Sequence, residues 1–287
     1  MNERQDAATA AADNVDDKTV AGFGDEWTRF DQSALSDAES QALFDSYFSI
    51  FPWRGLPADA QGFDLGCGSG RWALRVAPRV NTLHCIDPSD ALQVARRNLE
   101  AQANCRFHRA TVDRIPLDDA SMDFGYSLGV LHHVPDTAAG LAACVRKLKP
   151  GAPFLVYLYY AFDNKPLWFR MLWRASDLLR QLVSRMPHGL RFVSSQLLAV
   201  VVYWPLARLA WLAGKAGADV SNFPLTYYRE RSFYTMRTDA LDRFGTRLEQ
   251  RFTKAQIGQM MERAGLERIE FSTQMPYWCA VGFRRAA

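Results

Sequence analysis

The sequence has 287 residues, of which 48% are hydrophobic and 23% are charged, and its formal net charge is +3. This length suits one large α/β domain, or a domain with a substantial insertion, and the small charge argues against nucleic acid as a partner. The five cysteines are scattered and form no C-x-x-C pair, which argues against a disulfide framework and a zinc site and fits a reducing cytoplasm.

The N-terminal segment carries the weakest pattern. Residues 1–20 lack the apolar stretch of a signal peptide, and their Ala, Asp and Asn content predicts a disordered leader. Residues 37–51 then have the apolar spacing of a helix.

From residue 62 to residue 160, apolar segments alternate with segments of helical periodicity. The expected strands cover 62–65, 81–87, 105–111, 124–131 and 152–160, and the expected helices cover 71–80, 89–100 and 137–151. This alternation predicts an α/β fold with a parallel, doubly wound sheet.

The alternation stops after residue 160. Residues 161–231 have helical character, and 253–265 form a further expected helix that ends at a glycine. Residues 266–274 and 277–285 read as two strands separated only by Met275 and Pro276, so we expect an antiparallel pair.

The stretch GFDLGCGSGRW, residues 62–72, is the most informative motif. A phosphate-binding P-loop would need a lysine after its last glycine, and none follows here. A dinucleotide fingerprint would need a third glycine at position 71, which is Arg71. After these two exclusions, the pattern that remains is an acid, Asp64, followed by glycines at alternate positions.

This stretch resembles the first motif of class I S-adenosylmethionine-dependent methyltransferases. The small-molecule enzymes related to ubiquinone and menaquinone methyltransferases are the most similar subgroup, over residues 60–160 and 250–285. The resemblance implies a Rossmann-like, seven-stranded sheet of order 3-2-1-4-5-7-6 with a helical insertion after strand five. It divides the chain into a core of 21–160 and 250–287 and an acceptor-binding insertion or lid of 161–249.

S-adenosyl-L-methionine is the expected cofactor. A carboxylate at a strand end, Asp64, would attract the ammonium group of its amino-acid tail, and Gly66 and Gly68 let the backbone pass close to the ligand. Asp87, which ends the next strand about 20 residues later, suits the ribose hydroxyls. The predicted cofactor-binding residues are Asp64, Gly66, Cys67, Gly68, Asp87, Pro88, Thr111, Val112, Ser127 and Leu128.

Part of that set depends on the resemblance alone. Thr111 stands where the family usually has an adenine-binding Asp, and Val112 would offer its backbone N–H to the ring. Ser127 and Leu128 would lie beside the methionine moiety. Trp27 and Phe30 would fold over the cofactor, as similar segments do in relatives.

His132 and His133 are the candidate catalytic bases, because imidazole titrates near neutral pH. The alternative is that at least one of the pair packs structurally. Tyr157 and Tyr159 share a face near the end of the fifth strand, where an acceptor would lie, either as buried aromatics or in contact with it.

The insertion is basic and amphipathic. Residues 161–231 contain ten Lys or Arg and four Asp or Glu, a local net charge of +6. Between 167 and 186, basic and polar side chains oppose an apolar stripe, which consists of Trp168, Leu172, Ala175, Leu179, Leu182 and Met186. The apolar run 197–207 is too short to span a membrane. A lid on its own core, a cover for the acceptor, a membrane contact and a homodimer contact all remain open.

Residues 227–253 mix Tyr, Arg and acids densely. We predict that Tyr159, Tyr228, Arg229, Arg231 and Arg237 contact the acceptor, since Arg can grip a carboxylate or phosphate. The alternative is a salt-bridge network within the domain.

The sequence therefore predicts a cytoplasmic enzyme that transfers methyl from S-adenosylmethionine to an oxygen or carbon of an apolar or amphipathic small molecule, with an anionic group among the options. Its partner would be that small-molecule acceptor, and no metal site is expected. The alternative is a non-catalytic S-adenosylmethionine-binding adaptor at a membrane surface.

Overall fold

The computed structural model describes residues 13–286. Residues 1–12 of the predicted leader lie outside this range. Its last residues do not continue as a leader, because helix α1 spans Asp17–Arg29, with Asp16 capping it by accepting from the Thr19 backbone N–H at 2.7 Å. The cap satisfies a backbone donor at the helix start, and Thr19 is buried.

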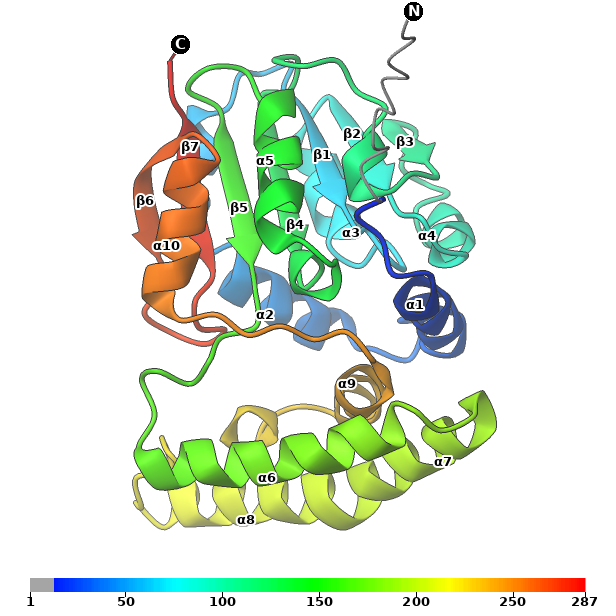
Figure 1. Ribbon diagram of the computed structural model, residues 1–287, viewed down its shortest axis with the longest axis vertical. Coiled ribbons are helices and arrows are strands. Elements are labelled where there is room, and N and C mark those ends of the chain that lie inside the picture. The colour runs from blue at the N-terminus through cyan, green and yellow to red at the C-terminus, as the bar shows by residue number, and fades with distance from the viewer. Residues whose placement is uncertain (1–12, 287) are drawn as a thin grey trace, which may run out of the picture.

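A seven-stranded sheet forms the centre of the molecule (Figure 1). Its strands are β1 (Gln61–Leu65), β2 (Thr82–Ile86), β3 (Cys105–His108), β4 (Phe124–Leu128), β5 (Pro153–Tyr157), β6 (Leu266–Phe271) and β7 (Ala280–Arg284). The order is β3-β2-β1-β4-β5-β7-β6; the first five strands are parallel, and β7 is antiparallel to both its neighbours. The predicted doubly wound, Rossmann-like α/β sheet and its strand order are confirmed.

The connection between the last two strands is longer than expected. β6 ends at Phe271 and β7 begins at Ala280, so more than Met275 and Pro276 separates them. The segment folds back on itself, with the Ser272 N–H donating to the Cys279 carbonyl at 2.8 Å.

Helices cover both faces of the sheet. α2 (Asp37–Tyr47), the short α3 (Ala73–Val76) and α4 (Ala91–Asn98) pack on one face, while α5 (Thr137–Lys147) and α10 (Lys254–Arg263) pack on the other. Strand alternation divides the core between the faces, because Phe154 and Val156 of β5 join the second layer and Leu155 joins the first.

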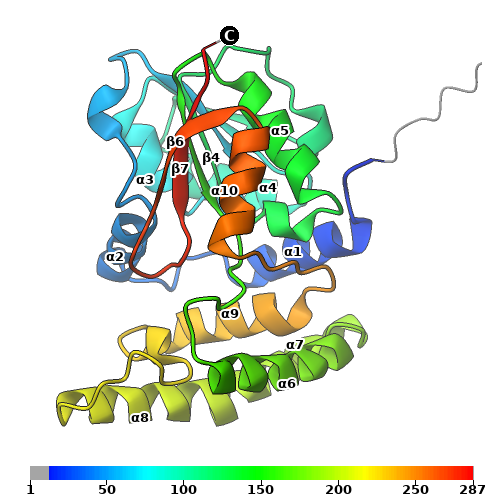
Figure 2. The ribbon, with the colours of Figure 1, turned by 60° about the vertical axis from the view of Figure 1, so that its left-hand side comes forward.

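The chain between β5 and α10 forms a separate helical layer, below the carboxyl ends of the parallel strands in Figures 1 and 2. It contains α6 (Leu167–Val183), α7 (His188–Leu198), α8 (Trp204–Lys215) and α9 (Phe233–Gly245). α9 lies between the sheet domain and the other three helices. A small core holds the layer together; it includes Val183, Tyr203, Ala207, Met236 and Phe244.

α7 and α8 form one helix. A π-helical segment, Ala199–Tyr203, joins them without a break and ends two residues before Pro205, whose ring would obstruct regular α-helical bonding. The combined helix His188–Lys215 has 28 residues and contains an 18-residue window with a mean hydropathy of 1.6, which makes it long and apolar enough to cross a membrane by length and composition. The apolar run 197–207, too short by itself to span a membrane, lies inside this longer helix.

Candidate functional site

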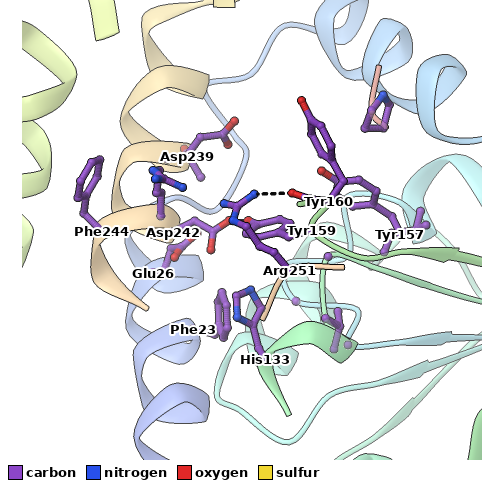
Figure 3. A pocket seen from close by; sticks show the side chains of 18 of the residues that line it. Phe23, Glu26, His133, Tyr157, Tyr159, Tyr160, Asp239, Asp242, Phe244 and Arg251 are labelled. Atoms are coloured by element: carbon purple, nitrogen blue, oxygen red, sulfur yellow. Dashed lines mark hydrogen bonds between the residues drawn. The ribbon is translucent and has the colours of Figure 1, made fainter. Parts of the chain in front are cut away.

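A cavity of about 520 Å³ lies between the carboxyl ends of the strands and the helical layer. α1 and the segments that follow β1, β2, β4 and β5 supply one part of its wall, and α6, α8 and α9 supply the other. Aromatic side chains line much of it, from Phe23 of α1 to Phe244 of α9 (Figure 3). Ligands of open α/β sheets bind at this edge.

The glycine turn after β1 forms one end of the cavity. Gly66 and Gly68 have φ angles of +75° and +54°, which side-chain-bearing residues rarely adopt. A Cβ atom on Gly66 would lie 2.4 Å from a methyl carbon of Val130, so only glycine fits there. Trp27 of α1 lies over Gly68, whose added Cβ would be 3.1 Å from the indole nitrogen. The turn thus carries no side chains at Gly66 and Gly68, both of which line the cavity, and Trp27 of α1 packs over it.

Asp87, which follows β2, fastens this turn. Its carboxylate accepts the Gly68 N–H at 2.9 Å, and it also accepts the backbone N–H and the hydroxyl of Ser89 at 2.9 and 2.6 Å. Burial raises the pKa of Asp87. A carboxylate that lines the cavity beside a bare glycine backbone fits a ligand rich in hydroxyl groups, such as a nucleoside ribose.

Eight of the ten predicted cofactor residues line the cavity: Gly66, Cys67, Gly68, Asp87, Pro88, Thr111, Val112 and Leu128. Two do not. Asp64 is 1% exposed and lies inside β1, behind the turn, where burial raises its pKa to about 8. Ser127 is fully buried and donates to the Leu65 carbonyl at 3.0 Å, which ties β4 to β1. Asp64 and Ser127 therefore do not line the cavity.

The two adjacent histidines differ in their surroundings. His133 lines the cavity, and its Nδ1 lies 2.7 Å from the Leu248 carbonyl oxygen. Because a carbonyl only accepts, Nδ1 carries the proton and Nε2 keeps its lone pair. Nε2 is buried and has no partner within the described residues, and burial lowers the pKa of His133, which keeps the ring neutral.

His132 is not among the cavity-lining residues. It is fully buried, and its ring stacks on Tyr159 with centroids 3.8 Å apart. Burial lowers the pKa of His132 well below its usual value. His132 therefore packs inside the protein, as the alternative expected of at least one of the pair, and His133 lines the cavity.

Three carboxyl groups that sequence reasoning missed line the cavity near His133: Glu26, Asp239 and Asp242 (Figure 3). Tyr228 donates to Asp239 at 2.9 Å, and Tyr159 donates to Asp242. Burial raises the pKa of Asp239 to about 6 and also raises that of Asp242. Burial and the two neighbouring acids raise the pKa of Glu26 well above its usual value.

Four cationic side chains also line the cavity: Arg71, Lys165, Arg243 and Arg251. Arg251 pairs with Glu249 at 2.8 Å and donates to the Tyr160 carbonyl at 3.3 Å (Figure 3). Its guanidinium lies over the rings of Tyr159 and Trp173, 4.9 and 4.8 Å from their centroids. The wall thus combines hydrogen-bond acceptors, aromatic faces and cations, which suits a molecule with an aromatic or apolar body and polar groups.

Of the five predicted acceptor contacts, only Tyr159 and Tyr228 line the cavity. Arg229 pairs with Glu230 at 3.5 Å, and Arg231 lies over the Tyr227 ring, 5.2 Å from its centroid. Arg237 donates to Gln196 at 2.6 Å. These three arginines contact other parts of the chain, and only the Arg229–Glu230 contact is a salt bridge. Phe30 also lies away from the cavity, where it packs edge-on against Tyr234.

Metal ligands do not gather in the described part of the chain. Within residues 13–286, no group of three or more His, Cys, Asp or Glu side chains is placed to hold a metal ion.

Residues 63–156 match a family model described as a methyltransferase domain. The ubiquinone biosynthesis O-methyltransferase of Alkalilimnicola ehrlichii is 32% identical over 128 residues, which cover 44% of this chain and 51% of that protein. The 27-O-demethylrifamycin SV methyltransferase of Amycolatopsis mediterranei is 29% identical over 132 residues, 42% of this chain and 45% of that protein.

The chain spans about half the length of these curated relatives. Among solved structures, the CurJ carbon methyltransferase superposes with a TM-score of 0.53 at 11% identity, covering 92% of this chain and 59% of that one. At that identity the likeness concerns the fold.

Proposed function

We propose, from the match of residues 63–156 to a methyltransferase domain model, that the protein transfers methyl from S-adenosylmethionine to an oxygen or carbon of an apolar or amphipathic small molecule. The observation that carries the proposal is the shared cavity, because the glycine turn, Asp87 and His133 all line it. The relatives named as O-methyltransferases support the reaction class.

The turn and Asp87 would hold the cofactor. Gly66 and Gly68 line the cavity and would meet its amino-acid end, Asp87 would accept from the ribose hydroxyls, and Trp27 covers the turn from α1. When bound, S-adenosylmethionine supplies an electrophilic methyl group attached to a positively charged sulfur.

His133 would act as the base. During methyl transfer, Nε2 of His133 would accept the proton that the acceptor hydroxyl loses. The Leu248 carbonyl holds the ring in the tautomer this step needs. The nearby Asp242 raises the pKa of His133 against the effect of burial, so it stabilises the ring once it is protonated.

The cavity suits an acceptor with hydroxyl groups, because Glu26, Asp239 and Asp242 accept hydrogen bonds from donors. The three arginines predicted to grip an anion lie outside its lining, but Arg71, Lys165, Arg243 and Arg251 line it, so an anionic group on the acceptor stays within the proposal. No specific observation favours the alternative of a non-catalytic adaptor. Cytoplasmic location and a homodimer stay predictions.

Titration calorimetry with S-adenosylmethionine, followed by radiolabelled methyl transfer to a panel of hydroxylated aromatic and isoprenoid-like compounds, tests the proposal. We expect submillimolar binding and label transfer to at least one hydroxyl-bearing compound. Absence of binding at submillimolar cofactor would refute it, and so would binding with no transfer to any member of the panel.

A further inference from the structure

The helical layer carries most of the apolar surface that the protein exposes. Of the 18 exposed large hydrophobic side chains in residues 13–286, 15 lie between positions 167 and 212. We call these 15 the outer face: Leu167, Trp168, Met171, Leu172, Leu178, Leu179, Leu182, Leu190, Val193, Leu197, Val200, Val201, Trp204, Leu209 and Leu212. Single apolar side chains are normal on a surface, whereas this concentration on two helices indicates an interaction site.

The helices present their large apolar side chains outward and smaller ones inward. On the α7–α8 helix, the inner positions Ala199, Ala207 and Ala210 are fully buried, whereas Leu197 and Trp204 are 59% and 50% exposed. α6 and the α7–α8 helix form the layer farthest from the sheet in both ribbon views (Figures 1 and 2). A helix that served only its own core would bury the larger side chains instead.

The charges around the outer face are almost all positive. Between Asp163 and Asp219 the sequence holds one acid, Asp177, which is paired with Arg180 at 2.5 Å. The exposed charged side chains on these helices are Arg170, Arg174, Arg185 and Lys215. Trp168 and Trp204 are half exposed, and tryptophan favours the boundary between water and lipid.

We propose that the outer face docks on the surface of an anionic lipid bilayer, with α6 and the α7–α8 helix lying in the plane of the membrane. An apolar stripe flanked by basic residues is the pattern of an interfacial helix. Although the 28-residue α7–α8 helix is long enough to cross a bilayer, Arg191 is buried on its inner side and Ala199 and Tyr203 belong to the core shared with α9. Crossing would expose these groups to lipid, whereas lying flat keeps them in place.

Docking would place one wall of the cavity against lipid. Leu172 belongs to the outer face, at 49% exposed, and also lines the cavity. An apolar acceptor dissolved in the bilayer would therefore meet the cavity beside Leu172; this consequence depends on the function proposed above, whereas the docking itself does not.

Flotation of the full-length protein with phosphatidylcholine vesicles, with and without phosphatidylglycerol, tests the docking. We expect flotation with the anionic vesicles, and at least about tenfold less bound protein for Leu178→Glu with Trp204→Glu. Arg170→Glu with Arg174→Glu should lower binding to anionic vesicles by about tenfold or more. Leu74→Glu is the matched control, since Leu74 is an exposed leucine outside the outer face, and it should float like the wild type.

Each variant is first shown to keep the thermal midpoint and the S-adenosylmethionine affinity of the wild type, so that loss of flotation is not loss of folding. Three results would overturn the proposal: wild-type protein that floats with neither vesicle, flotation unchanged in the Leu178→Glu, Trp204→Glu variant, or a dimer in light scattering that this variant abolishes without any vesicle binding. The last result would assign the outer face to a second copy of the chain.

Discussion

Replacing Gly66 by alanine tests the geometry of the glycine turn directly. Gly66 has a φ of +75°, which costs a side-chain-bearing residue about 1–2 kcal/mol. The added Cβ would also lie 2.4 and 2.5 Å from the two methyl carbons of Val130. Val130 cannot move aside by rotating a flexible end, so overpacking adds about 1–3 kcal/mol. We expect Gly66→Ala to lower the free energy of unfolding by about 2–5 kcal/mol.

Two further variants separate these contributions. Gly151 has a φ of +79° and no atom within 4 Å of its added Cβ, so Gly151→Ala reports the conformational cost alone. Val130→Ala removes the two methyl carbons but keeps its own Cβ, 2.9 Å from the added Cβ, so in that background Gly66→Ala should cost less than in the wild type and still more than Gly151→Ala. Urea unfolding of the four variants and the wild type measures these free energies, and calorimetry measures S-adenosylmethionine affinity, which we expect to fall in Gly66→Ala.

Equal costs for Gly66→Ala and Gly151→Ala would refute the reasoning, because the contact with Val130 would then contribute nothing. Strict additivity of Gly66→Ala and Val130→Ala would refute it as well. An unchanged cofactor affinity in a folded Gly66→Ala variant would argue that the cofactor does not approach this turn.

The remaining predictions concern the base, a buried carboxyl group and the arginines outside the cavity. His133→Ala should lower kcat by about 10²- to 10⁴-fold while leaving cofactor affinity nearly unchanged; a rate within twofold of the wild type would exclude His133 as the base. Asp64, with its pKa raised to about 8, keeps its proton when folded and loses it near pH 4 when unfolded, so it makes the protein less stable as pH rises between these values. Asp64→Asn should therefore flatten the fall in unfolding free energy from pH 5 to pH 8, by at most about 1.4 kcal/mol per unit, and parallel curves for variant and wild type would show that Asp64 does not titrate as inferred. Arg229→Ala and Arg237→Ala should leave the KM for the acceptor unchanged, because both side chains lie outside the cavity lining; a several-fold rise in KM would restore their predicted role.

The sheet was predictable because its signals are local. Strands buried on both faces read as short apolar segments, and the helices between them keep their own periodicity. The turn after β1 was predictable for the same reason, since the positive φ angles at Gly66 and Gly68 select glycine directly. The strand order was predicted from the family resemblance. The antiparallel pair β6–β7 was also predicted, but its connection was predicted too short, because it extends beyond Met275 and Pro276 on both sides.

The two predicted cofactor residues that do not line the cavity lie inside strands. Asp64 and Ser127 each stand one residue before the end of their strand, so their side chains point to a face of the sheet and not to the cavity at its edge. Asp87 and Gly66 follow the strand ends and do reach the cavity. A difference of one or two positions therefore decides whether a side chain reaches the cavity, and the boundary of a strand is the feature that a sequence defines least well.

The acid cluster could not have been found from local patterns. Glu26 comes from α1, and Asp239 and Asp242 come from α9, more than 200 positions later in the chain. They meet because both helices lie across the carboxyl ends of the strands (Figure 1). The dense mixture of Tyr and Arg around residue 230 was a real signal of a polar layer, but composition does not tell which side chains face inward.

The amphipathic pattern of α6 shows the same limit more sharply. Its periodicity separates an apolar stripe from a polar one, yet it does not say which stripe meets the protein. Arg180, on the polar side, is 7% exposed and donates to the Thr246 carbonyl at 3.0 Å, while Trp168 and Leu179 of the apolar stripe are exposed. Arg180 is buried because it has partners within the protein, in Asp177 and the segment after α9, whereas Arg170 and Arg174 stay exposed. A lid that served only its own core would bury Trp168 and Leu179, so their exposure supports the occupant proposed for the outer face.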